Sequence, residues 1–403
     1  MKNHKGIQID KDKNYSIALM SPFVILTIQY FLLANIATLG INIGGIIQLF
    51  SKVIVGIILS YTIVKLMKTN KILIILVYLF ALTLFLSQYM LFIENRLYLK
   101  ELIFPIFFMC LPLFVISLNI NKMDTLMSVM KKSSFIIYLF AILLSVEDLI
   151  GIVNIGEYSG PLSNYLLIPT LIFLNNSIDK LSLKYLVLSF VSLFFILVLG
   201  SRGAILCIII FLIIRTLFAK SNNKYTNHIV RLLTIISIII FAFTYKDILN
   251  KLYIFLLKNG IESRTLHLFL SDELYLSGRD NIYSVLIKYI FEHPIMGFGI
   301  GGDRRILSGE AVYAHNIIIE LIGNFGLLLG LFLIFLLFII ISYALLKFKN
   351  INKNIIIIWI SLGFVHLFIS SSYLIEMKFW IFIGLLINIM FIKTKVTLEK
   401  ENE

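Results

Sequence analysis

Long apolar runs restrict the fold of this chain more than any other feature of its sequence. Of its 403 residues, 60% are hydrophobic and only 14% are charged, against about 25% charged residues in a soluble domain. A transmembrane helix uses about 20 apolar residues, and the sequence supplies about twelve such segments. We therefore predict an all-α polytopic membrane protein, which excludes a soluble enzyme, a disordered chain and a coiled coil. The expected spans are 16–37, 43–64, 72–93, 101–120, 134–153, 162–178, 184–200, 203–219, 230–246, 315–346, 354–373 and 377–392.

The Lys and Arg residues indicate which ends of these spans face the cytoplasm. Cytoplasmic loops of membrane proteins carry an excess of Lys and Arg. With the N-terminus in the cytoplasm, most of the 35 basic residues fall in cytoplasmic segments, and an even number of spans returns the C-terminus to the same side. The formal net charge of +13 then reflects topology, so we expect no nucleic-acid partner. The short outer loops contain only Arg96, Lys100, Arg202 and Lys378.

One long segment, residues 247–314, is expected outside the cytoplasm between spans nine and ten. We predict amphipathic helices in it at 246–258 and 280–291, lying on the bilayer surface or across the mouth of the helix bundle. The second helix should end at Glu292-His293-Pro294, because proline disfavours helix in the residue before it. The chain is thus expected to form a single polytopic membrane domain, 1–403, that carries this loop. The predicted apolar face of 280–291 has helical spacing and consists of Ile282, Val285, Leu286, Tyr289 and Ile290.

A tight outer turn, Gly200-Ser201-Arg202-Gly203, is the first candidate for a binding site. Glycine permits a sharp turn and a close approach of ligand to backbone. An arginine fork held in such a turn suits an anionic group, above all a phosphate. The alternative interpretation of Arg202 is an interfacial side chain that reaches toward lipid headgroups.

A second candidate site lies at the end of the outer segment. The stretch 293–305 contains several glycines followed by Arg304 and Arg305, and His315 stands at the start of span ten. Its spacing matches G-x-G-x-x-G, but a dinucleotide fold would need a βαβ context that is missing. A glycine-rich loop beside two arginines instead predicts an anion cradle. His315 is suited to act as a general base or to bind a diphosphate, the alternative being a plain interfacial histidine.

Polar residues inside the apolar spans are costly and therefore invite a functional interpretation. Asn316, Glu320 and Asn324 form one stripe on span ten, which we expect to face the bundle interior. Lys52 lies inside span two, where it needs an anion or water. A substrate phosphate, a paired structural charge and a snorkelling lysine are all compatible with that position.

The candidate residues form a cationic set on the outer side. Arg279, which precedes the helix at 280–291, could share a phosphate with the N-terminus of that helix, although a plain surface arginine is equally compatible. The sequence shows no metal-ligand spacing and no P-loop or nucleophile elbow. We therefore expect an anionic, phosphate-bearing substrate, no metal and no cofactor. The full set is Lys52, Arg202, Arg279, Arg304, Arg305 and His315.

In these motifs the chain resembles the O-antigen polymerase and O-antigen ligase superfamily. The resemblance rests on about twelve spans, the Gly-Ser-Arg-Gly turn before span eight, and one long outer loop. That loop carries His-Pro-Ile-Met-Gly-Phe-Gly and ends in Ala-His-Asn at the next span. The resemblance implies a GT-C-like helical fold in the plasma membrane. It also implies a metal-independent glycosyltransferase that takes a glycan from undecaprenyl diphosphate at the outer face.

By this resemblance, Arg202 would bind the diphosphate leaving group. His315 would position or deprotonate the acceptor hydroxyl, or support the diphosphate. Arg279 matches an arginine often found before the loop helix, whereas Lys52, Arg304 and Arg305 are additions from the charge pattern. We expect a polymerase of surface polysaccharide working beside a flippase and a chain-length regulator. A ligase that transfers the glycan to another acceptor and a transporter of lipid-linked oligosaccharide remain alternatives.

Overall fold

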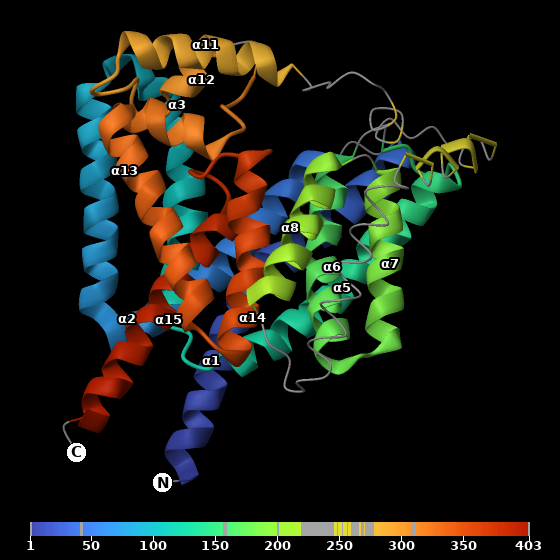
Figure 1. Ribbon diagram of the computed structural model, residues 1–403, viewed down its shortest axis with the longest axis horizontal. Helices are drawn as coiled ribbons and strands as arrows, with labels where there is room; N and C mark the ends of the chain where they lie inside the picture. The colour runs from blue at the N-terminus through green and yellow to red at the C-terminus, as the bar shows by residue number, and fades with distance from the viewer. Residues whose placement is uncertain are drawn as a thin grey trace. The chain divides into compact units, whose positions relative to one another are not determined.

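The computed structural model describes residues 2–401 apart from 41–42, 156–158, 200, 219–245, 248, 252, 256, 259–265, 267–269, 271–277 and 308–310. Every regular element of the described residues is helical, as the hydropathy pattern predicts (Figure 1). The predicted segment 230–246 lies, but for its last residue, outside this part of the chain. The principal helices are α1 (Lys2–Thr38), α2 (Gly44–Leu91), α3 (Arg96–Ile103), α4 (Leu111–Leu118), α5 (Met123–Leu149), α6 (Gly160–Lys180), α7 (Leu183–Val198), α8 (Arg202–Phe218), α11 (Arg279–Glu292), α12 (Gly302–Ile306), α13 (Ile317–Lys347), α14 (Asn350–Trp359) and α15 (Met377–Glu401).

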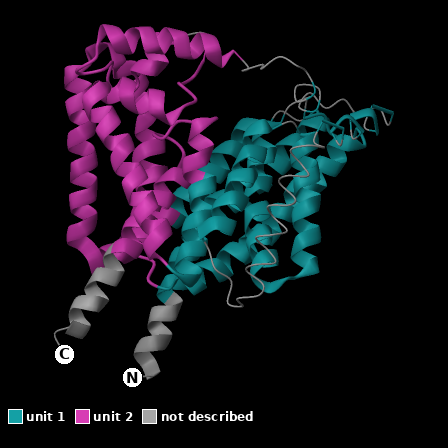
Figure 2. Ribbon diagram, in the orientation of Figure 1, with its two compact units in different colours: residues 1–58, 122–274, 349–362 teal, residues 59–121, 275–348, 363–403 magenta. Residues whose placement is uncertain are grey.

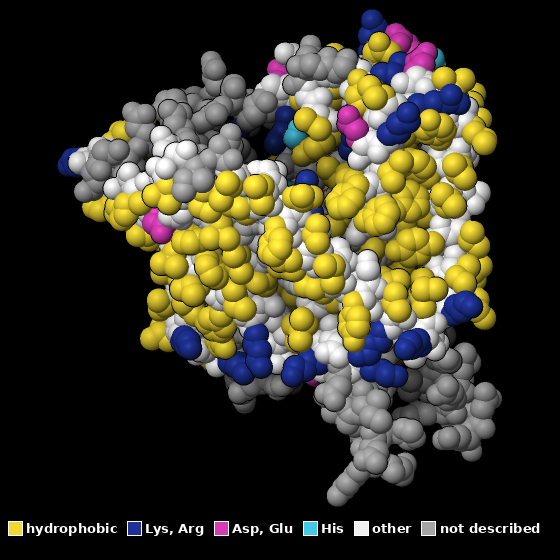
Figure 3. Space-filling model, turned by 180° about the vertical axis from the view of Figure 1, so that it is seen from behind, with side chains coloured by type: hydrophobic (Ala, Val, Ile, Leu, Met, Phe, Trp, Pro, Cys, Tyr) yellow, Lys and Arg dark blue, Asp and Glu magenta, His cyan; other side chains and the backbone are white. Residues whose placement is uncertain are grey.

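Six helical segments in the described part of the chain are long and apolar enough to cross a membrane. The longest, α2, exposes Ile72 (76%), Leu76 (58%) and Phe80 (69%) at four-residue intervals. A soluble protein rarely exposes an apolar face of this extent, so this face is suited to lipid. In Figure 3 hydrophobic side chains cover much of the visible face, and Lys and Arg lie both below and above them. The six segments are Lys11–Thr38, Gly44–Leu91, Ile93–Leu118, Met123–Leu149, Ile317–Lys347 and Asn350–Phe368.

The chain folds into two compact units, each built from three separate stretches of sequence (Figure 2). Unit 1 comprises residues 1–58, 122–274 and 349–362, and unit 2 comprises residues 59–121, 275–348 and 363–403. Each unit therefore depends on contacts between segments that are far apart in the chain.

Within unit 1, α5 packs against α1 and α6, α7 packs against α6, and α14 packs against α5, α6 and α8. Basic residues gather at one end of this unit. The buried Arg215 guanidinium forms an ion pair with Asp179, and the Lys353 ammonium donates to the carbonyl of Phe218 over 3.0 Å. Arg202 starts α8 and therefore lies at the opposite end of that helix.

Within unit 2, α11 lies across the end of the unit and packs on α13 (Figure 1). The amphipathic pattern of 280–291 is confirmed. Ile282, Leu286 and Ile290 are buried, and Val285 and Tyr289 pack partly buried beside them. The helix ends at Glu292, directly before the His-Pro pair that the sequence marks as its end.

Two helices have interruptions at residues that belong to unit 2. The predicted spans 43–64 and 72–93 lie in the single helix α2, which departs from helical geometry at Asn70 (φ −129°, ψ 43°). This break falls in the basic stretch between the two predicted spans. The helix α13 breaks at Gly326 (φ 78°, ψ 171°). There a side chain would collide with the backbone of Ile295, so Gly326 permits a close contact between α13 and the loop that contains Ile295.

Candidate functional site

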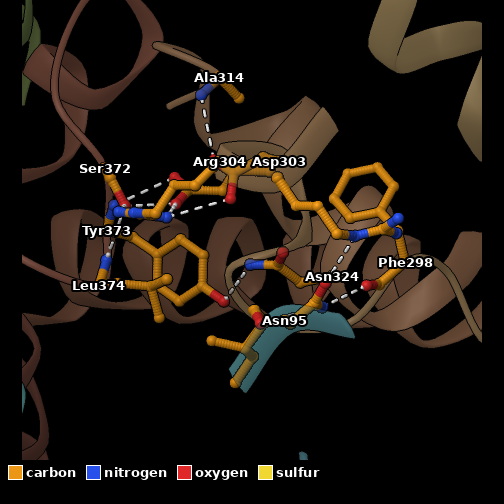
Figure 4. A network of polar contacts seen from close by, with 12 residues as sticks. Asn95, Phe298, Asp303, Arg304, Ala314, Asn324, Ser372, Tyr373 and Leu374 are labelled. Carbon is orange, nitrogen blue, oxygen red and sulfur yellow. Dashed lines mark hydrogen bonds and ion pairs between the residues drawn. The ribbon is translucent and has the colours of Figure 1, made fainter. Parts of the chain in front are cut away.

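A buried polar network in unit 2 centres on Arg304, whose side chain is 7% exposed (Figure 4). Its guanidinium donates to Oδ1 of Asp303 over 3.0 Å and lies 4.0 Å from Oε1 of Glu320. It also donates to the hydroxyl of Ser372 over 3.2 Å, and that hydroxyl in turn bonds Glu320. Both acidic side chains are fully buried, so the Arg304 guanidinium lies beside two buried acidic groups. A buried cation in this setting is stable only while its partners remain.

The polar stripe of α13 faces this network, as predicted. Glu320 and Asn324 are 0% and 1% exposed. The backbone N–H of Tyr373 donates to Oε2 of Glu320 over 3.2 Å, and the amide of Asn324 donates to the Tyr373 hydroxyl over 2.9 Å. Asn316 caps α13 by accepting hydrogen bonds from the N–H groups of Ile318 and Ile319. The stripe therefore joins α13 to the loop before α15.

The glycine-rich loop at 293–302, called the clasp loop below, packs on α13 and does not form an open anion-binding site. Its Phe298 ring is buried, and the Phe298 N–H donates to the carbonyl of Gly323 over 2.7 Å. The Ile300 N–H donates to the side chain of Gln88 over 3.0 Å. Gly297 has a φ of 68° and lies so close to α13 that a side chain would strike the backbone of Gly323. Because these N–H groups already have protein acceptors, the loop does not offer them to an anion.

Both arginines after this loop have carboxylate partners. Arg304 belongs to the buried network, and Arg305 pairs with Glu94 at 2.6 Å and donates to Oδ1 of Asn95 over 2.9 Å. The amide of Asn95 donates to the carbonyl of Phe298 over 2.7 Å. Arg304 and Arg305 were predicted to bind a diphosphate, and the structure pairs Arg304 with Asp303 and Arg305 with Glu94.

His315 lies two residues before the start of α13. Its backbone adopts the left-handed conformation with φ 55°, and its ring centroid lies 4.3 Å from that of Tyr313. Nδ1 of His315 is buried and has no hydrogen-bond partner among the described residues. Burial, together with the charge of Arg279, lowers the pKa of His315 to about 4. The imidazole is therefore neutral at pH 7, and one ring nitrogen is able to accept a proton.

Arg279 and His315, two residues that the sequence singled out separately, belong to the same cluster. Arg279 is the first residue of α11 and follows Gly278, whose φ is 76°. Its charge influences Tyr313 as well as His315. The structure thus brings a half-buried arginine into electrostatic range of a neutral histidine.

Sequence reasoning missed several members of this cluster. Burial raises the pKa of Tyr313, and the charge of Glu376 adds to that rise. Burial also favours the neutral form of Glu376, but Lys378 and His366 outweigh it and lower the pKa of that carboxyl. Nδ1 of His366 lies 3.7 Å from Oε2 of Glu376. The run Ser370-Ser371-Ser372-Tyr373 before a charged Glu376 was the only signal in the sequence, and it interrupts an apolar region.

Arg202 and Lys52 belong to unit 1. Arg202 is half-buried, and the hydroxyl of the preceding Ser201 accepts a hydrogen bond from the N–H of Ala204 over 3.3 Å. The N–H of Ser159 donates to the carbonyl of Leu199 over 3.1 Å, which ties the start of α6 to this turn. Lys52 lies on α2 with an exposed side chain.

Comparison with known proteins gives no family for the chain. No protein-family model matches it, and no curated protein matches it. Its function is therefore inferred from its residues and their geometry.

Proposed function

We propose that the chain is a glycosyltransferase that polymerises undecaprenyl-diphosphate-linked oligosaccharide repeat units at the outer face of the plasma membrane. The buried Nδ1 of His315, which has no hydrogen-bond partner among the described residues, lies within electrostatic range of Arg279, and this pair carries the proposal. A base and a cation held together suit a reaction in which a hydroxyl loses a proton while an anionic group departs. The resemblance of the sequence motifs to the O-antigen polymerases supplies the substrate class.

In the proposed step, the hydroxyl oxygen of the acceptor sugar attacks the anomeric carbon of the donor. The bond between that carbon and the diphosphate oxygen breaks, and the diphosphate leaves with the bonding electrons. The hydroxyl proton passes to His315. Arg279 stabilises the charge on the leaving diphosphate, because an arginine fork matches phosphate geometry. The resemblance of its motif makes Arg202 the second candidate for that role. No nucleophilic side chain and no metal take part.

The number of spans, their arrangement and their orientation in the membrane belong to the same proposal. We infer about twelve spans with a GT-C-like arrangement, both termini in the cytoplasm and the segment 247–314 on the outer side. The gathering of Lys131, Lys180, Arg215 and Lys353 at one end of unit 1 supports this orientation, because basic residues favour the cytoplasmic side. A flippase and a chain-length regulator are the expected partners, together with membrane lipid.

Ligase activity uses the same donor and the same leaving group. A ligase would differ only in the acceptor hydroxyl, so the cluster around His315 serves either enzyme. We favour the polymerase because the sequence offers no second basic region dedicated to another acceptor.

A transporter of lipid-linked oligosaccharide is the second candidate, and one structural observation favours it. Transporters often bind their substrates at interrupted helices. Here α13 breaks at Gly326, and the helix that follows α14 changes to π and 3₁₀ geometry over 360–368. Because the break at Gly326 accommodates the clasp loop, it has a structural explanation that requires no transport.

Reconstitution separates these candidates. The purified chain in proteoliposomes, supplied with lipid-linked repeat units, should produce a ladder of longer lipid-linked glycans and release undecaprenyl diphosphate. The variant His315→Ala should lose this product by a factor of about 10²–10⁴, the usual contribution of a general base. Movement of the glycan across the bilayer with no change in its size would contradict the proposal and identify a transporter.

A further inference from the structure

A pocket of about 460 Å³ opens in unit 1 at the end of α1. The pocket lies at the end of the helices opposite the basic cluster around Arg215 and Asp179, so it shares the end of the unit where α8 begins with Arg202. None of its lining residues is Lys or Arg. The lining consists of Tyr30, Leu33, Ala34, Ala37, Thr38, Asn154 and Ile155.

Two acidic residues at the end of α5 hold one wall of this pocket in place. The N–H of Ile155 donates to Oδ1 of Asp148 over 2.9 Å, and the N–H of Ile152 donates to the carbonyl of Glu147 over 2.9 Å. The carboxylate of Glu147 accepts a hydrogen bond from the amide of Asn35 on α1 over 2.8 Å. The sequence offered no role for Glu147 and Asp148, and the structure uses them to fasten the loop after α5 beside α1.

The opposite wall is linked to the turn that carries Arg202. The hydroxyls of Tyr30 and Ser159 lie 3.1 Å apart in a hydrogen bond. The N–H of Ser159 donates to the carbonyl of Leu199, three residues before Arg202. The ring of Tyr30 also lies 6.1 Å from that of Tyr165. The pocket and the arginine turn are therefore parts of one hydrogen-bonded end of unit 1.

The chemistry of the lining fits a sugar ring better than a phosphate or a hydrocarbon chain. Without a cation, the pocket has nothing to neutralise a phosphate. Tyr30, Thr38 and Asn154 place polar groups among Leu33, Ala34, Ala37 and Ile155. The Thr38 hydroxyl donates to the carbonyl of Asn35 over 2.6 Å, so its lone pairs remain to accept a hydrogen bond. A hydrocarbon chain offers no donor to these lone pairs of Thr38, whereas a sugar offers both C–H faces and hydroxyl groups.

We propose that this pocket binds a neutral sugar ring of the lipid-linked repeat unit and so selects the glycan that reacts near Arg202. The proposal rests on the glycosyltransferase function proposed above. In this proposal α1 and the loop held by Glu147 and Asp148 recognise the glycan, whereas arginine side chains bind the diphosphate. A volume of about 460 Å³ lies in the usual range for small-molecule sites, roughly 300–1,000 Å³.

The test uses two pocket variants and one matched control in the full-length chain. Ala34→Phe fills the pocket, and Thr38→Val removes a hydrogen-bond acceptor while keeping the shape of the side chain. Leu32→Phe adds a ring to the same helix at a position that is 41% exposed and does not line the pocket. The melting temperatures of all variants in detergent establish that they fold. If Ala34→Phe does not fold, Thr38→Val alone tests sugar binding in the pocket.

Two measurements follow on each variant. In polymerisation assays, Ala34→Phe should raise KM at least tenfold with kcat within about threefold of the parent. Thr38→Val should raise KM by roughly twofold to tenfold, the worth of one hydrogen bond, and Leu32→Phe should change neither constant. An unchanged KM in both pocket variants would overturn the proposal.

Direct binding keeps this test separate from the proposed function. Saturation-transfer NMR with the oligosaccharide released by mild acid from the lipid-linked repeat unit should show binding that Ala34→Phe abolishes and Leu32→Phe retains. This binding measurement tests the pocket even if the parent chain makes no polymer. Absence of polymer would contradict the proposed function without contradicting sugar binding in the pocket. Loss of undecaprenyl phosphate binding in Ala34→Phe, with oligosaccharide binding unaffected, would identify a lipid site and contradict the sugar pocket.

Discussion

The backbone N–H of Ala314 donates a hydrogen bond to Oδ2 of Asp303 over 3.1 Å. This bond fixes the chain immediately before His315 to a carboxylate that is fully buried. The other oxygen of Asp303 holds Arg304, whose guanidinium carbon lies 5.8 Å from the centre of the Tyr313 ring. Because Tyr313 packs on His315, the buried ion pair sets the position of the histidine from two sides.

Removing the charge of Asp303 should destabilise unit 2. Asp303→Asn leaves Arg304 buried with only Glu320, at 4.0 Å, as an acidic partner. Breaking a buried pair typically lowers the free energy of unfolding by about 3–5 kcal/mol, and the remaining carboxylate places this variant near the lower value. Thermal or denaturant unfolding in detergent measures the change. Glu94→Gln is the control, because Glu94 is 74% exposed in its pair with Arg305 and such pairs contribute under about 1 kcal/mol.

The acid limb of the activity profile should lie far below the usual range for a histidine. His315 must be neutral to accept a proton, and its pKa is lowered to about 4. Activity should therefore rise with pH through about 4 and stay level above it. Initial rates between pH 3.5 and 8 test this, with exposed His293 replaced by Ala as the control. A limb near 6.5 would show that another group, or an unshifted histidine, controls the rate.

The lowered pKa of His315 also makes the free energy of unfolding depend on pH. The unfolded chain, in which His315 has an ordinary pKa near 6.5, binds a proton before the folded chain does. The contribution of His315 to stability is therefore fully present above about pH 6.5 and is lost as the pH falls toward 4. Comparing the pH dependence of unfolding in the parent and in His315→Ala isolates this contribution.

Arg202 should not tolerate lysine if it binds a diphosphate. Arg202→Lys keeps the positive charge but loses the planar fork that pairs with phosphate oxygens. The expected result is a loss of about 10²-fold or more in polymer formation with little change in melting temperature. Arg96→Lys is the matched control, because Arg96 lies over the Tyr89 ring at 4.8 Å and is not part of the proposed reaction. Equal activity of the two variants would mean that Arg202 is an interfacial anchor.

Gly326 should be one of the least replaceable residues of α13. Its φ of 78° is unfavourable for other residues, and a side chain would collide with the carbonyl oxygen of Ile295. Gly326→Ala should lower the free energy of unfolding by about 1–3 kcal/mol and loosen the clasp loop. The control is Gly45→Ala in α2, where nothing lies within 4 Å of the added carbon. That substitution should be neutral or stabilising by up to about 1 kcal/mol.

Periodicity predicted those parts of the fold that depend on local patterns. The buried face of α11 and the inward-facing Glu320 and Asn324 follow from helical spacing and from the cost of polar groups in lipid. The basic stretch at 65–71 predicted a connection between spans, and the structure has a break at Asn70 there. In each case neighbouring residues carried the information.

The contacts that define the candidate site are long-range and could not be predicted in the same way. The partners of Arg304 include Ser372, which is 68 residues away in sequence, and nothing near Arg304 indicates it. The glycines at 297–302 have the composition of an anion cradle, yet the buried Phe298 between them turns the loop into a clasp on α13. The burial of that ring and the hydrogen bonds from the Phe298 and Ile300 N–H groups to protein acceptors distinguish the two outcomes.

The central claim is that the chain joins lipid-linked repeat units, and cells that lack the chain test it most directly. Undecaprenyl-linked glycans would be extracted and sized by mass spectrometry, beside a gel of the surface polysaccharide. The account predicts single repeat units on lipid and no long polymer, restored by the parent chain but not by His315→Ala. Long polymer still attached to lipid would identify a ligase instead, and unchanged glycans would contradict both enzymes.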